Sequence, residues 1–187
     1  MLKTTFLNNV LNQYKIKPYL VLLFLIIFSS TTFSETKLVI LGSGTPNPDP
    51  NRFGSGYAII VNEKAYIVDF GPGIVRRISA MSPSWGGEFS AMELENIDIA
   101  FLTHIHSDHS GALADLILTP WVMGRDEPLK LFGPQGLKKM AKKITEAYED
   151  DINYRLYGSQ PANKLGYLTN VSEILDDGLI YKDDNVE

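Results

Sequence analysis

All three histidines of this 187-residue chain fall in one short stretch, THIHSDHSG at residues 103–111. His104 and His106 are separated by one residue, so in an extended chain their side chains point to the same side. Asp108 and His109 follow directly, where an apolar run gives way to a glycine. Neutral imidazole and carboxylate are ligands that suit zinc, and Mn²⁺ or Fe²⁺ are also compatible with them. The spacing therefore predicts a site for one or two metal ions, held by His104, His106, Asp108 and His109.

The composition limits the other chemistry that the chain can do. There is no cysteine, which excludes thiolate ligands, a cysteine nucleophile and disulfides. A buried cluster of histidines without a metal would be costly, because the imidazoles would compete for protons and partners. Any metal ion must therefore be held by imidazole and carboxylate groups.

The elements around the motif must carry it from a strand into a helix. Residues 97–103 are apolar enough for a strand that is buried on both faces. Residues 111–123 are typical of a helix, which Pro120 is expected to end. Further strands are predicted at 36–42, 57–62, 64–70, 129–133, 171–175 and 178–183, and further helices at 71–81 and 134–151, the last with an apolar face of Leu137, Met140, Ala141, Ile144 and Tyr148. Strands that alternate with helices after an initial hairpin predict a mixed sheet with helices on its outer face.

The first 34 residues have the pattern of a signal peptide. Three lysines and no acidic residue accompany a ten-residue apolar run at 19–28, which is followed by small and hydroxyl residues. We expect cleavage near Ser34 and an exported protein, periplasmic or secreted. The alternative is an uncleaved membrane anchor, which would be the chain's only contact with a membrane.

The charge of the remaining chain bears on its partners. Without residues 1–34 the chain keeps 14 basic and 22 acidic residues, a net charge of −8. A protein that binds nucleic acid usually carries a basic footprint, so a long polyanion is disfavoured as the main partner, although a local basic patch stays open.

Four segments carry a resemblance to a known family. THIHSDHSG resembles the H-x-H-x-D-H signature of the metallo-β-lactamase-fold hydrolases. LGSGTPNPD, AYIVDFGPG and LFGPQGL are similar to segments of its ribonuclease Z and arylsulfatase-like branch. The resemblance covers residues 37–187 and implies an α/β fold, the αββα sandwich, with one or two zinc ions at the sheet edge. It implies that His104 and His106 bind the first ion, that Asp108 and His109 bind the second, that Asp108 is also the catalytic proton acceptor, and that Asp69 orients a metal-ligand histidine.

The resemblance implies a hydrolase that uses a zinc-bound hydroxide on phosphate or sulfate esters, with a small anionic ester as substrate. Two alternatives stay open: an acyl hydrolase of the same fold, such as a lactonase or β-lactamase, and a non-catalytic remnant. A loop typical of ribonuclease Z is matched here by Pro48 and Arg52 but lacks the lysine and asparagine of that family. Arg52 could hold an anionic oxygen or simply face solvent.

The chain departs from the family after its motif. No histidine follows His109, so the ligands that close the family's site are missing by count. We therefore expect residues 35–187 to be a C-terminally truncated domain, the N-terminal half to two-thirds of the sandwich. Such a domain should expose an apolar sheet face, bind zinc weakly, and either aggregate or stay partly unfolded. A partner chain that supplies the missing ligands, or a homo-oligomer, stays open.

Overall fold

A computed structural model describes residues 35–159 and 161–187 of the chain. The predicted signal peptide, residues 1–34, lies outside the described residues, and so it stays a prediction. Within the described part, no helix is both long enough and apolar enough to span a bilayer.

Six strands form one mixed sheet in the order in which they occur in the chain. The first, second and third strands pair antiparallel to their neighbours, and the third to the sixth strand run parallel to one another. The initial hairpin and the mixed sheet are therefore as predicted, although the central strand is shorter than the apolar run at 97–103 suggested. The strands are β1 (Thr36–Gly42), β2 (Gly56–Val61), β3 (Lys64–Val68), β4 (Ile99–Phe101), β5 (Leu129–Pro134) and β6 (Thr169–Ile174).

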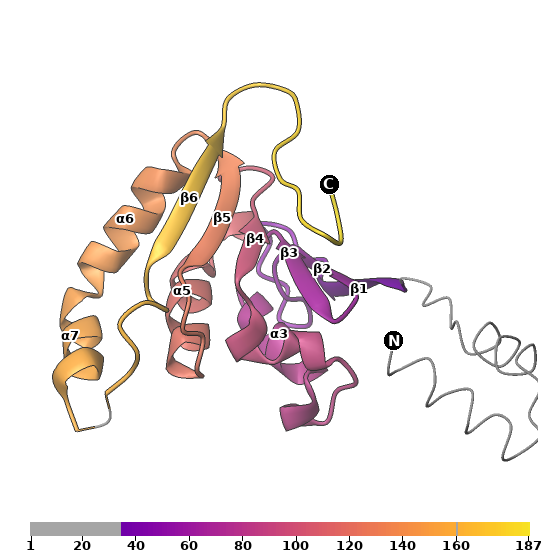
Figure 1. The fold of residues 1–187 in the computed structure, drawn as a ribbon. Helices are drawn as coiled ribbons and strands as arrows, with labels where there is room; N and C mark the ends of the chain where they lie inside the picture. Colours follow the sequence, from indigo (N-terminus) through magenta and orange to yellow (C-terminus); the bar gives the residue numbers. More distant parts are fainter. Residues whose placement is uncertain (1–34, 160) are drawn as a thin grey trace, which may run out of the picture. The chain divides into compact units, whose positions relative to one another are not determined.

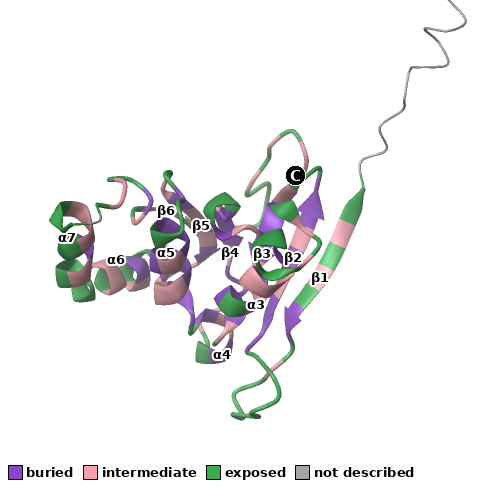
Figure 2. Cartoon of the chain, turned by 90° about the horizontal axis from the view of Figure 1, so that it is seen from below, coloured by how far each residue is buried: buried purple, intermediate pink, exposed green. Residues whose placement is uncertain are grey.

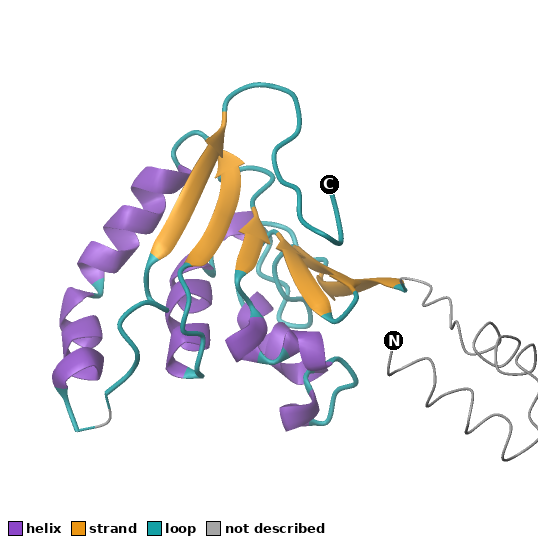
Figure 3. Cartoon of the chain, in the orientation of Figure 1, coloured by secondary structure: helices purple, strands orange, loops and turns teal. Residues whose placement is uncertain are grey.

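The helices lie on one face of this sheet, as Figures 1 and 3 show. The core lies between the two layers, because alternate strand residues such as Ala65, Ile67 and Leu131 are fully buried against the helices. Short 3-10 turns at Pro83–Trp85, Ser90–Met92 and Leu94–Asn96 lie in the connection to β4. The helices are α3 (Ile74–Met81), α4 (Ser107–Ser110), α5 (Leu113–Val122), α6 (Leu137–Ala147) and α7 (Glu149–Tyr157).

Helix α5 runs past Pro120, so the prediction that this proline ends the helix is wrong. Proline has no N–H and leaves the carbonyl four residues earlier without its helical donor. In the structure, the Leu116 carbonyl accepts a hydrogen bond from Nη1 of Arg125 at 3.1 Å, and the Ile117 carbonyl accepts one from Nη2 at 2.6 Å. A buried guanidinium therefore supplies the missing donor, and the helix continues to Val122.

The single helix predicted over 134–151 is two helices. Helix α6 ends before Tyr148, and α7 begins after it. Tyr148 lies at the junction with its side chain exposed, so its predicted place on the apolar face is wrong. The other residues of that face are buried or pack on the core: Leu137, Met140, Ala141 and Ile144.

The strand predicted at 178–183 is also wrong, because residues 175–187 form no strand. Asp183 contacts the sheet through its side chain instead: its carboxylate accepts hydrogen bonds from Nζ of Lys64 and from the hydroxyl of Tyr66. This segment leaves β6 and folds back over the second face of the sheet, the one without helices (Figures 1 and 3).

The second face is covered only in part. Leu38 and Ile40 of the edge strand β1 are 67% and 61% exposed, and Figure 2 shows the exposed residues along that strand. Toward the middle of the sheet, Tyr66 and Ile99 are buried. The apolar face that the sequence predicted to be exposed is therefore solvent-exposed along β1 and buried at the centre of the sheet.

Candidate metal centre

The histidine motif lies where two parallel strands end side by side. Strands β3 and β4 are parallel, with Val68 opposite Phe101, so the residues that follow each strand leave the same edge of the sheet. One of these exits carries Asp69, and the other leads through Thr103 into the histidines. The fold therefore brings together residues that are 34 to 40 positions apart in the chain.

Backbone hydrogen bonds fasten the motif loop to the neighbouring loops. Phe70 N–H donates to the carbonyl of His109 at 2.7 Å, and Ser55 N–H donates to the carbonyl of Asp108 at 2.9 Å. The approach is so close that a Cβ atom added to Gly71 would lie 2.0 Å from the Asp108 carbonyl oxygen. A glycine is therefore required at position 71, and the loop geometry depends on it.

The carboxylate of Asp69 is the centre of the side-chain network. It is almost completely buried, and it accepts hydrogen bonds from the backbone N–H of Thr103 at 2.8 Å and from the Thr103 hydroxyl at 2.9 Å. Its second oxygen lies 2.7 Å from Nδ1 of His109. One carboxylate thus positions both the start of the loop and its last histidine.

This network sets the orientation of two imidazoles. Because the Asp69 carboxylate only accepts hydrogen bonds, Nδ1 of His109 carries a proton. The Thr103 hydroxyl donates its single proton to Asp69 and so accepts from Nδ1 of His104, 3.0 Å away. Nδ1 is occupied in both rings, and in their neutral form each Nε2 carries the lone pair that a metal ion needs.

The remaining motif residues lie beside these two rings. The ring centroid of His104 is 4.1 Å from that of His109 and 4.7 Å from that of His106, whose side chain is exposed. Oδ2 of Asp108 is 3.4 Å from Nε2 of His109. Its other oxygen, Oδ1, is buried and has no hydrogen-bond partner among the described residues. A carboxylate that lies beside the His109 imidazole and has one buried, unpartnered oxygen fits a cation site in its chemistry.

The structure thus brings together all five predicted site residues: Asp69, His104, His106, Asp108 and His109. Within residues 35–159 and 161–187, however, no three histidine, aspartate or glutamate side chains are arranged to hold an ion as they stand. The donors are gathered and oriented, but they do not form a closed coordination shell by themselves.

Two residues of this region could not be assigned from the sequence. The hydroxyl of Thr103 links Asp69 to His104. Ser55, which holds the Asp108 carbonyl, gives no signal beyond its place in a glycine-rich loop. Arg52 lies 3.5 Å from Asp49 in an exposed pair, so nothing in the structure ties it to the motif.

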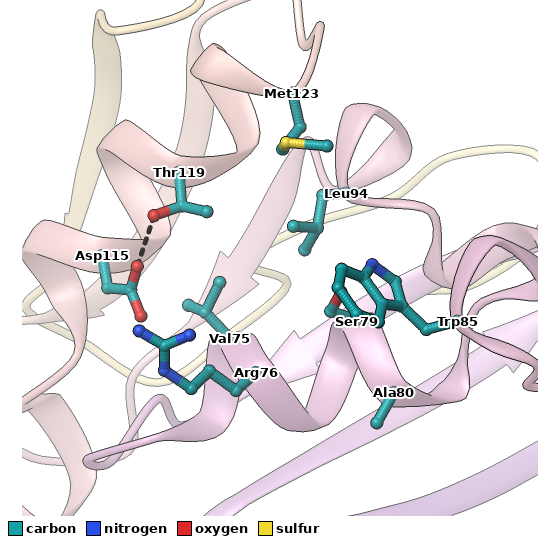
Figure 4. Close-up of a pocket in the computed structure, with 9 residues that line it drawn as sticks. All are labelled: Val75, Arg76, Ser79, Ala80, Trp85, Leu94, Asp115, Thr119 and Met123. Atoms are coloured by element: carbon teal, nitrogen blue, oxygen red, sulfur yellow. Dashed lines mark hydrogen bonds between the residues drawn. The ribbon is translucent and has the colours of Figure 1, made fainter.

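A hollow of about 380 Å³ lies between α3, α5 and the 3-10 turns that follow α3. Figure 4 shows Trp85 on one wall, with Arg76 directed toward Asp115 at the other end. None of the five predicted site residues lines this hollow. The metal-ligating chemistry therefore lies outside it, on the motif loop.

Comparisons with known proteins agree with this geometry. A family model described as the metallo-beta-lactamase superfamily matches residues 49–148. Ribonuclease Z of Mycobacterium bovis is 32% identical over 123 residues, which cover 64% of this chain and 41% of the relative. Ribonuclease Z of Mycobacterium avium is also 32% identical, with the same coverage. This chain therefore spans about two-fifths of the length of these curated relatives.

Two solved structures have a similar fold. The short form of human tRNase Z has a TM-score of 0.56 at 21% identity, with 74% of this chain and 45% of that chain covered. A long form of RNase Z from yeast has a TM-score of 0.51 at 15% identity, with 68% and 18% covered. At these identities the likeness concerns the fold alone.

Proposed function

The chain belongs to the metallo-beta-lactamase superfamily of hydrolases, and we propose that it carries the metal-binding part of a phosphodiesterase that acts on RNA. The observation that carries the proposal is the network around Asp69. This carboxylate occupies Nδ1 of His109 directly and Nδ1 of His104 through Thr103, which leaves both Nε2 atoms to a metal ion. A purely structural histidine cluster has no need for this shared orientation.

The proposed ligands are His104, His106, Asp108 and His109, with zinc as the ion and Mn²⁺ or Fe²⁺ as alternatives. A bound zinc ion would act as a Lewis acid toward the phosphate and would make water a stronger nucleophile. Asp108 has one oxygen beside His109 and one unpartnered oxygen, so it can hold an ion and also accept a proton. Asp69 keeps the histidine rings in place and does not itself react.

The names of the relatives favour a phosphodiester as the substrate. Each is called a ribonuclease Z or a tRNase Z, and none of these names refers to a sulfate ester or a lactone. The expectation of a small anionic ester, and the argument against nucleic acid from a net charge of −8, gain no support from them. We therefore place an RNA phosphodiester first, and a small phosphodiester serves as the simplest probe.

Metal binding tests the site independently of turnover. Zinc titration followed by calorimetry should give binding that is lost in His104→Ala and His109→Ala. Asp126→Asn is a matched control, because Asp126 is exposed and lies outside the motif. Because four donors without a closed shell form an open site, we expect weak binding. Zinc binding that is unchanged in both histidine variants would overturn the proposed site.

Turnover tests the reaction class. The chain is supplied with zinc and assayed on bis(4-nitrophenyl) phosphate, a tRNA, 4-nitrophenyl sulfate and a simple lactone. The proposal expects the phosphodiesters to be cleaved best and Asp108→Asn to lose the activity. Preference for the sulfate or the lactone would favour the other hydrolase classes. No turnover by a zinc-loaded chain would favour the non-catalytic remnant.

Export through residues 1–34 stays a separate proposal, supported only by the residue pattern. Mass spectrometry of the mature N-terminus tests it, and a first residue near Glu35 is expected.

A further inference from the structure

The second face of the sheet has a cluster of aromatic side chains at its centre. Phe101 of β4 and Phe132 of β5 lie opposite each other in the sheet, with stacked rings 5.1 Å apart. Tyr66 of β3 is buried beside them. The cluster is covered from outside the sheet by residues 181–187, which we name the strap (Figure 1).

Tyr181 makes the apolar part of this contact. Its ring meets three rings of the sheet edge-on, with centroid distances of 6.2 Å to Tyr66, 5.8 Å to Phe101 and 5.4 Å to Phe132. Edge-to-face pairs at these distances contribute beyond the area that they bury. Val186 packs on the same cluster.

Asp183 makes the polar part. Its Oδ2 accepts hydrogen bonds from Nζ of Lys64 at 2.9 Å, from the hydroxyl of Tyr66 at 2.7 Å and from the hydroxyl of Tyr181 at 2.7 Å. Its Oδ1 accepts from the backbone N–H groups of Asn185 and Val186. One carboxylate therefore shapes the strap as a turn and joins it to two residues of the sheet.

The pKa values of Asp183 and Lys64 are shifted in the directions that favour an ion pair between them. Burial opposes the charged form of Asp183, yet its donors hold the pKa of this carboxyl well below its usual range. Burial lowers the pKa of Lys64, but the hydrogen bonds to Asp183 and Tyr181 outweigh it and raise the pKa above its ordinary value. Burial, together with the hydrogen bond to Asp183, raises the pKa of Tyr66 to about 12.

The segment that joins β6 to the strap adds little packing. Leu175 and Leu179 are 71% and 70% exposed, and Ile180 is 46% exposed. The recognition elements are therefore confined to the strap itself, with Tyr181 and Asp183 as its two anchors.

From this arrangement we infer that the strap is an intramolecular ligand of the second sheet face, recognised through Tyr181 and Asp183. The face around Lys64, Tyr66, Phe101 and Phe132 is its binding site. A ligand of this site is a short turn in which an aromatic residue, here Tyr181, precedes a carboxylate, here Asp183, by two positions. The joining segment acts as a tether that raises the local concentration of this ligand, so a free peptide of the same sequence binds when the tethered one is removed.

Hydrogen–deuterium exchange on the full chain tests the first half of the inference. Asp183→Asn removes the charge that collects three donors, whereas Asp184→Asn changes an exposed neighbour. We expect exchange in residues 181–187 and 59–66 to rise about ten-fold in Asp183→Asn, because charge-assisted hydrogen bonds are lost, and to stay unchanged in Asp184→Asn. Equal exchange in the two variants would overturn the inference.

A peptide titration tests the second half. The chain is shortened after Asp177, and a peptide of residues 178–187 is added with its binding followed by calorimetry. The peptide should bind, its Asp184→Asn version should bind equally well, and its Asp183→Asn version should bind about ten-fold more weakly. A shortened chain with native circular dichroism that binds no peptide, or binds the two variants equally, would contradict the inference. If the shortened chain is unfolded, the exchange comparison on the full chain decides alone.

Discussion

Two aspartates, Asp69 and Asp183, organise two regions of this molecule in the same way. Each carboxylate collects donors from parts of the chain that are far apart in sequence. Asp69 is almost fully buried and holds the loop that carries the histidines. Asp183 lies at the surface of the sheet and holds the strap. The first orders a site, and the second covers a face.

The difference lies in what surrounds each carboxylate. Around Asp69 the backbones of three loops are fastened to one another, and Gly71 leaves no room for a side chain. Around Asp183 the contacts to the sheet are made by side chains alone, from Lys64 and Tyr66. A site held by backbone and side chain should resist change more than a surface contact held by side chains, and this expectation can be tested.

The largest effect is expected from Asp69→Asn. The residue has a φ of 60°, which asparagine tolerates, so the change removes charge without straining the backbone. Loss of the charge-assisted hydrogen bonds to Thr103 and His109 should lower the free energy of unfolding by about 3 kcal/mol. Urea denaturation measures it, with the exposed Asp126→Asn as the control. If Asp69→Asn lowers the free energy of unfolding no more than Asp126→Asn does, the network around Asp69 does not stabilise the fold as argued.

The two aspartates were not equally visible in the sequence. Asp69 stands directly after an apolar strand and before a Gly-Pro-Gly turn, and the histidine motif follows a second such strand. The residues that follow two parallel strands lie at the same edge of the sheet, so local patterns are enough to predict that Asp69 and the histidine motif lie close together. Asp183 is one of many acidic residues near the end of the sequence, and its partners on the sheet lie 117 to 119 positions earlier. No local sequence pattern predicts a contact between residues that are so far apart in the chain.

The errors in the fold have the same origin. Pro120 was expected to end a helix because the local rule says so, but the donor that replaces its N–H comes from Arg125, beyond the helix. Residues 178–183 have apolar residues at spacings typical of a strand, but Tyr181 and Asp183 contact Lys64 and Tyr66 of the sheet through their side chains instead of pairing with a neighbouring strand. Local propensity was overruled by a tertiary contact in both cases.

A smaller effect is expected from Lys64→Met, which tests the strap from the side of the sheet. Methionine keeps most of the apolar length of the side chain and removes the charge that Asp183 faces. The free energy of unfolding should fall by about 1.5 kcal/mol, because the hydrogen bonds from Lys64 to Asp183 and Tyr181 are lost. Lys182→Met is the matched control, since Lys182 pairs only with Glu187 in the described part of the chain and is largely exposed. A Lys64→Met loss as large as that of Asp69→Asn would mean that the two regions do not differ in strength.

Thr103→Val isolates the hydroxyl between Asp69 and His104. The backbone N–H of residue 103 still donates to Asp69, so the loss of unfolding free energy should be only about 1 kcal/mol. The affinity for zinc should fall by about ten-fold, because Nδ1 of His104 loses its partner. Thr45→Val, in an exposed loop, is the control. Unchanged zinc affinity would show that the hydroxyl does not orient the imidazole.

The smallest effect is expected in the titration of Tyr66 above pH 10. The folded state raises the pKa of Tyr66 to about 12, through burial and the hydrogen bond to Asp183. A group with a raised pKa stabilises the fold fully below its unfolded value of about 10, and that contribution is lost as the pH rises through about 12. The difference in ultraviolet absorbance between the unmodified chain and Tyr66→Phe reports the tyrosinate of this residue together with any change at Tyr181, which shares Asp183 with it. In Asp183→Asn the titration of Tyr66 should move to lower pH, because the strap no longer holds the phenol in its protonated form. If the titration of Tyr66 stays in place in that variant, burial alone raises its pKa, and the strap contributes less to this face than Asp69 contributes to the histidine loop.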